Sequence, residues 1–369
     1  MARRRRGRQF TNRMVPGHQK GHPYTDALLS NIHGDPISGG PYDSGFPRVP
    51  VAPPSGTQYI LPGMATQLVS PKAPTVGTGG GGNPWPDTFM SYTSSGPISL
   101  NDVHGTSPED PYIIEYLSFE GLERPNPRPI TLEDCSNILI RRIDTRKCTM
   151  GLLYALNCQN ITMEYCRAEN IGYEFLGEAF PGNDNDLNLY QLNNVDGFLI
   201  HDIKGRYGNT EDVISHYGSH NGEVYNIEWE GAISASAPTS DSSASVQWES
   251  DSGTGAILGD LDGSGLWVHD CTFLNPGQVG LAIASGTNCY FEDCIVYSEG
   301  NSAIGGAENI AAYIWNQYTT CSAVGMINCR GYFQNENSFW DGGGCSSVDI
   351  SGSDFLDNTL DPEDYRVTL

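Results

Sequence analysis

The chain has 369 residues, a formal net charge of −24 and only four lysines. Its 44 glycines, its many Asn and Ser residues and the lack of a long helical periodicity exclude a mainly helical protein and favour a turn-rich β protein. The apolar runs are far shorter than the ~20 residues of a membrane-spanning helix, so we expect no membrane contact.

The first quarter of the chain differs from the rest in charge. Residues 1–90 carry nine basic and four acidic side chains, which gives a net charge of +5. Residues 91–369 carry eleven basic and forty acidic side chains, which gives a net charge of −29. The first segment is also rich in Pro and Gly, a composition that cannot bury enough apolar surface to fold by itself. We therefore expect residues 1–95 to form an extended anchoring arm.

The arm begins with a run of arginines and carries scattered apolar side chains that could hold it on neighbouring subunits. The residues expected to bind or anchor are Arg3, Arg4, Arg5, Arg6, Arg8, Phe10 and Trp85. The arginines could contact acidic protein or nucleic acid, or they could be a solvated terminus. No apolar stretch follows them, so they do not form a secretory signal and we expect synthesis in the cytoplasm.

Eight segments after the arm share one apolar pattern. The aligned residues are Ile140, Met163, Ile200, Val224, Val268, Phe291, Met326 and Ile350, separated by 23, 37, 24, 44, 23, 35 and 24 residues. The residues two before and three after each position are apolar or cysteine, except Gly222 and Ser353. A strand signal recurring at a fixed period indicates a solenoid whose coils stack to form the core.

The basic period leaves room for three short strands and three turns in each coil, as in a parallel β-helix. We therefore predict an all-β, single-stranded parallel β-helix of about 8–10 rungs over residues 96–355, followed by an acidic tail at 356–369. The longer intervals indicate inserted loops, and the interval of 44 could also hide an extra rung.

Ten cysteines occur in the chain, four of them at one equivalent position of the repeat. Free cysteines pack well as small apolar side chains, so we expect these to line the inside of the coil. No Cys-x-x-Cys pair suggests zinc, and we expect all the thiols to be reduced.

Asp or Asn recurs two residues after several of the aligned positions, for example at Asp202, Asp270 and Asp293. Neighbouring rungs lie ~4.8 Å apart, so Asp270 and Asp293 could form a close acidic pair for acid chemistry or for a cation. The alternative is a polar ladder at a turn.

Asp260 and Asp262 begin a sequence that resembles the start of a calcium loop. Oxygen ligands at alternate positions suit calcium, but Cys271 stands where the loop would need a bidentate carboxylate. We expect no other cofactor. The same residues are ordinary loop formers, and both interpretations stay open.

The repeat and the segment around Glu211 and Asp212 resemble the pectate-lyase-like superfamily of right-handed parallel β-helices. That superfamily includes polygalacturonases, polysaccharide lyases and bacteriophage tailspikes. The resemblance implies catalytic roles for Glu211, Asp212, Asp270 and Asp293, because inverting hydrolysis needs two spaced carboxylates. A lyase would instead use a base such as Lys204 or Arg206. The Gly-His-Gly motif is replaced around His220, and no Arg-Ile-Lys occurs.

Two functions follow from these observations. The first is a structural protein of a virus particle, of a bacteriophage by resemblance, in which the arm binds other virion proteins and the β-helix projects outward as a capsid decoration or spike. We expect a homo-oligomer, with a trimer favoured, that could bind host surface glycans. The second is a polysaccharide hydrolase or lyase. The arm and the incomplete motifs favour the first.

Overall fold

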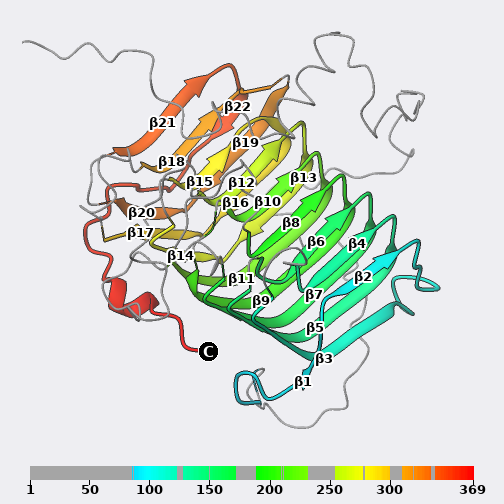
Figure 1. Cartoon of the computed structure of the whole chain (residues 1–369). Helices are drawn as coiled ribbons and strands as arrows, with labels where there is room; N and C mark the ends of the chain where they lie inside the picture. Colours follow the sequence, from blue (N-terminus) through cyan, green and yellow to red (C-terminus); the bar gives the residue numbers. More distant parts are fainter. Residues whose placement is uncertain are drawn as a thin grey trace, which may run out of the picture.

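The protein is an elongated stack of parallel β-strands wound into a parallel β-helix (Figure 1). Its structure, a computed structural model, describes residue 85, residues 87–122, 128–148, 150–171 and 188–208, residue 210, and residues 212–231, 254–276, 279–299, 310–318, 320–333 and 337–369. The predicted all-β architecture is confirmed.

Two parallel sheets run the length of the coil. The first contains, in spatial order, β1 (Thr93–Ser94), β3 (Tyr112–Glu120), β5 (Ser136–Arg146), β7 (Gln159–Glu169), β9 (Asp196–Gly208), β11 (His220–Gly231), β13 (Ser264–His269), β16 (Gly286–Glu292), β19 (Cys321–Ile327) and β22 (Ser346–Asp349). The second contains β2 (Ile98–Asn101), β4 (Ile130–Glu133), β6 (Leu153–Leu156), β8 (Tyr190–Asn193), β10 (Asp212–Tyr217), β12 (Thr254–Asp260), β15 (Val279–Ile283), β18 (Ile310–Trp315) and β21 (Asn337–Gly343).

Each coil has three faces. The first half of a long strand such as β5 forms the first face, and its second half forms the second face. In the later coils the second face is made by separate strands, β14 (Thr272–Leu274), β17 (Ile295–Ser298) and β20 (Arg330–Phe333). The second sheet forms the third face.

The corner between the first and second faces explains the predicted polar ladder. The residues there adopt a left-handed backbone conformation, with φ of 54° at Asp202 and 51° at both Asp270 and Asp293. Asn and Asp tolerate this conformation better than most other residues with a side chain. The turn therefore favours the recurring Asp and Asn, although Arg142 and Tyr165 adopt the same conformation at this corner, each with φ of 53°.

The aligned apolar residues form the core, as predicted. Seven of the eight are almost fully buried, from Ile140 to Met326, and they stack directly on their equivalents in the next rung, as Val224 does on Val268. Ile350 is the exception, with 45% of its surface exposed. The expectation that it points into a closed coil is wrong, because it follows the last strand, β22, beyond which the described residues add no further rung.

The long intervals of the repeat are insertions at one corner. β11 pairs directly with β13, so the interval of 44 residues places no extra strand between them in the first sheet. The additional residues of the three long intervals fall largely in 172–187, 232–253 and 300–309, all between the second face and the third and all outside the described residues.

Eight cysteines are free and buried, as predicted for apolar side chains inside the coil. The expectation that every thiol is reduced is wrong, because Cys321 and Cys345 form a disulfide. The two residues are 24 positions apart, which is one turn of the coil, and the winding of the chain brings their α-carbons within 4.5 Å.

The residues just before the first rung lie on the second face of the coil. The guanidinium of Arg167 donates to the carbonyl of Asp87 at 3.0 Å, and the backbone amide of Met90 donates to Asp144 at 2.6 Å. Three aromatic rings of this segment lie 5.4–5.7 Å from the same guanidinium. Trp85, one of the expected anchoring residues, thus packs on the chain's own body.

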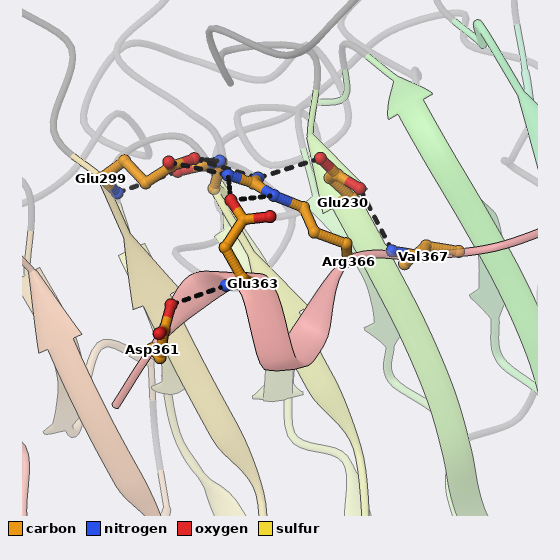
Figure 2. Close-up of polar contacts among 7 residues, drawn as sticks. Glu230, Glu299, Asp361, Glu363, Arg366 and Val367 are labelled. Atoms are coloured by element: carbon orange, nitrogen blue, oxygen red, sulfur yellow. Dashed lines mark hydrogen bonds and ion pairs between the residues drawn. The ribbon is translucent and has the colours of Figure 1, made fainter. Parts of the chain in front are cut away.

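The C-terminal segment covers a later part of the second face (Figure 2). It contains the 3-10 helix η4 (Pro362–Tyr365), after which Arg366 reaches Glu230 at 3.0 Å and Glu299 at 2.8 Å. Leu360 of this segment is buried against Leu274 and Tyr297. The end of the chain is therefore folded against the coil. No helix in the described ranges is both long and apolar enough to cross a membrane.

Candidate functional site

An unusual row of aromatic side chains runs along the outside of the first face, and we call it the aromatic strip. It consists of Tyr165, His201, Tyr225, His269 and Trp267, which come from the successive strands β7, β9, β11 and β13. The inward neighbours of these residues are the buried apolar side chains of the repeat. His201, Tyr225, His269 and Trp267 each stand next to an inward residue of the repeat, so alternation along the strand points them outward. Tyr165 lies instead at the corner between the first and second faces, with φ of 53°.

The rings of the strip are stacked from one rung to the next. The centroids of His201 and Tyr225 are 4.7 Å apart with the planes 4° from parallel, and those of Tyr225 and His269 are 5.2 Å apart. Trp267 lies 4.0 Å from His269 on the same strand, and Tyr165 meets His201 edge to face at 5.9 Å. Four adjacent rungs thus carry a continuous aromatic surface.

His201 lies between two carboxylates. Its Nδ1 is 2.7 Å from Asp202 Oδ2 and its Nε2 is 3.4 Å from Glu164 Oε2. Burial disfavours the charged imidazole, but the hydrogen bonds to the two carboxylates outweigh it and raise the pKa of His201 to about 9. The ring is therefore protonated at neutral pH and stacks as a cation on Tyr225.

His269 repeats this arrangement two rungs further along. Its Nδ1 is 2.8 Å from Asp270 Oδ2 and its Nε2 is 3.2 Å from Glu223 Oε1. Burial opposes protonation here too, and the two carboxylates again prevail and raise the pKa of His269. The neighbouring Trp267 donates its indole N–H to Glu292 at 3.1 Å. Each imidazole is held in place on both sides.

Among the predicted catalytic carboxylates that the structure describes, Asp212 lies apart from Asp270 and Asp293. Asp270 and Asp293 are exposed at the corner beside the strip, on consecutive rungs. Asp212 is fully buried at the start of β10 on the third face, where its backbone amide donates to Asn188 at 3.0 Å. The apolar core of the coil separates these two places. Glu211 lies outside the described residues.

The candidate bases of a lyase are engaged in ion pairs. Lys204 Nζ lies 2.8 Å from Glu228, and Arg206 Nη2 lies 2.7 Å from Glu169, all on the second face. Arg3, Arg4, Arg5, Arg6, Arg8 and Phe10 of the arm lie outside the described residues.

The two residues of the predicted calcium loop differ in surroundings. Asp260 ends β12 and is buried, whereas Asp262 is exposed in the turn that follows, with φ of 68°. Within the described part of the chain, no group of three or more His, Cys, Asp or Glu side chains is placed to hold a metal ion. Calcium binding stays a prediction.

The sequence-predicted site residues include the position two after each aligned residue but not the position one after it, where three of the strip residues stand. That position holds Glu164, His201, Tyr225, His269 and Glu292 on five consecutive rungs. A run of aromatic, histidine and acidic residues at one outward position of the repeat was the available signal.

Comparisons with known proteins add the following. No protein-family profile and no curated protein sequence matches the chain. Among solved structures, the fold is similar to PfbA, a surface adhesin of Streptococcus pneumoniae, with a TM-score of 0.36 and 7% identity over 73% of this chain and 74% of that one. It is also similar to ORF18 of Geobacillus virus E2, with a TM-score of 0.21 and 11% identity over 70% of this chain and 51% of that one.

Proposed function

We propose that this chain is a structural protein of a bacteriophage particle, a capsid decoration or short spike whose β-helix projects outward and binds glycans of the host surface through the aromatic strip. The anchor to other virion proteins is residues 1–84, the part of the predicted arm that precedes the residues packed on the coil. Several copies of the chain assemble together, a trimer being the arrangement we favour.

The observation that carries the proposed glycan binding is the aromatic strip. The rings of the strip face one another, so the row offers mainly ring edges to a ligand. The flat C–H surfaces of sugar rings can pack against such an aromatic row, and sugar hydroxyls donate hydrogen bonds to carboxylates. Stacked rings on successive rungs, ~4.8 Å apart, give a linear surface parallel to the axis of the coil, which suits a chain molecule. The adjacent Asp202, Glu223 and Asp270 supply acceptors.

The described residues of the β-helix form a core among themselves, which supports a separate anchoring role for residues 1–84. The main core runs from Ile114 to Phe355, and residues 87–92 and 360–367 cover parts of its second face. The basic arm precedes this acidic body, so opposite charges favour docking of arms on the bodies of neighbouring copies or on another acidic virion protein.

The proposal is tested by purifying virus particles by density and sedimentation and identifying their proteins by mass spectrometry. We expect the full chain in the particles at a fixed copy number relative to the main capsid protein. Its presence only in the soluble fraction of lysed cells would contradict a virion role. Binding of the purified chain to host cell envelopes, and its loss in Trp267→Ala, tests the glycan role separately.

A further inference from the structure

The charge around the aromatic strip restricts the kind of glycan that it can bind. Five carboxylates border the strip, those of Glu164, Asp202, Glu223, Asp270 and Glu292, each in contact with a strip residue. The strip itself contains two groups that can carry a positive charge, the imidazoles of His201 and His269. Even with both protonated, five negative and two positive charges leave an excess of three negative charges.

Among the described cations near the strip, Arg142 offsets part of this excess, whereas Arg141 and Lys204 are paired with carboxylates away from the strip. Arg141 pairs with Glu115 at 2.6 Å, towards the first rung. Arg142 lies over the ring of Tyr116 at 5.8 Å and over that of the strip residue Tyr165 at 5.5 Å. Its charge reduces the excess around the strip from three negative charges to two. Lys204 is paired with Glu228 on the second face. The whole region after residue 90 carries a net charge of −29, which adds to the negative potential.

We infer that the strip binds a neutral glycan, built of hexoses or N-acetylated hexosamines, and rejects glycans that carry carboxylate, sulfate or phosphate groups. This inference rests on the proposed glycan-binding function. The imidazoles do not reverse it, since each is already held between two carboxylates of the protein, so an acidic sugar would have to displace one of them.

The carboxylates also explain how the strip would bind a neutral glycan. Asp270 has 59% of its side chain exposed, and Glu223 has 28%, so both have free acceptor capacity beside the rings of Trp267 and His269. Sugar hydroxyls can donate to these oxygens while a sugar face packs on the part of the indole that His269 leaves exposed. Such binding involves no net charge on the ligand and depends little on salt.

The test measures binding of the full chain to two glycans of equal length by isothermal titration calorimetry. One is a neutral hexasaccharide of N-acetylglucosamine, and the other is the acidic hexasaccharide of galacturonic acid. We expect the neutral probe to bind at least tenfold more tightly than the acidic one, with a Kd that changes less than twofold between low and physiological salt.

Variants locate the site and test the charge argument. Trp267→Ala should weaken the neutral probe at least tenfold, whereas Tyr332→Ala, a partly buried aromatic residue on the second face, should leave its Kd unchanged. Replacing Glu223 by Gln together with Asp270 by Asn should strengthen the acidic probe relative to the neutral one. Circular dichroism confirms that each variant is folded.

The outcomes are distinguishable. Equal or tighter binding of the acidic probe would overturn the inference while leaving a glycan-binding role in place. Binding of the neutral probe that survives Trp267→Ala would overturn the assignment to the strip. Failure to bind any glycan would contradict both the inference and the glycan role, while detection of the chain in virions would still support the structural role.

Discussion

Arg167 holds both carboxylate oxygens of Asp144 in a buried ion pair on the second face, with Nε at 2.7 Å from Oδ1 and Nη2 at 2.8 Å from Oδ2. Neither side chain has more than 2% of its surface exposed. The same two residues receive the segment that leads from the arm into the first rung, through Asp87 and Met90. The pair therefore joins the arm to the coil.

Removing one partner of this pair should be costly. We expect Arg167→Ala to lower the free energy of unfolding by about 3–5 kcal/mol, because Asp144 would remain as an uncompensated buried charge. Urea denaturation measures the change. The matched control is Arg330→Ala, which breaks an ion pair with Asp357 in which the arginine is 44% exposed and should cost less than about 1 kcal/mol. Equal losses in the two variants would contradict a buried pair.

His216 should make the protein sensitive to acid. Its side chain is buried inside the coil, with Nε2 3.1 Å from the hydroxyl of Tyr190, and burial lowers its pKa to about 3. The stability due to the neutral ring is fully present above the unfolded pKa of about 6.5 and is lost as pH falls towards 3, at up to about 1.4 kcal/mol per pH unit. His216→Leu should remove this slope. The difference between the two proteins in unfolding free energy from pH 7 to 4 is the measurement, and a constant difference would refute the assignment.

Gly222 interrupts the apolar repeat because a neighbouring ring fills its place. A Cβ at this position would overlap the ring of Phe198, which lies beside it on β9. We expect Gly222→Val to cost about 1–3 kcal/mol through overpacking. Combining it with Phe198→Ala should cost less than the sum of the two single changes, because the new side chain gains space. Additive losses would show that the two positions are not in contact.

These cases show where sequence reasoning succeeds and where it stops. The period placed Ile140, Val268 and their equivalents in the core because every rung repeats the same inward position. It could not place His201 beside Glu164, which is 37 residues away, because that contact depends on how strands on adjacent rungs are aligned across an insertion. The absence of an apolar side chain at Gly222 is likewise explained only by the position of Phe198 on the neighbouring strand.

The disulfide between Cys321 and Cys345 should stabilise the last rungs. Closing a loop of 24 residues restricts the unfolded chain, so we expect reduction to lower the free energy of unfolding by about 3 kcal/mol. Denaturation with and without dithiothreitol measures it, and the double variant with Ala at both positions should not respond to the reductant. Identical unfolding of the oxidised and reduced protein would contradict the stabilising role.

The eight free cysteines should resist alkylation in the folded protein, because they are buried. Burial also raises the pKa of these thiols, for example that of Cys158 to about 12.

The most direct test of the virion role compares two forms of the chain during infection, the full chain and one lacking residues 2–84. The deletion ends before Trp85, so it keeps the segment that packs on Arg167 and should leave a folded β-helix that unfolds cooperatively. We predict that quantitative mass spectrometry of purified particles finds the full chain at a constant copy number and finds the shortened chain absent, although both are made in equal amounts. Equal incorporation of the two forms, or absence of the full chain from the particles, would contradict the account.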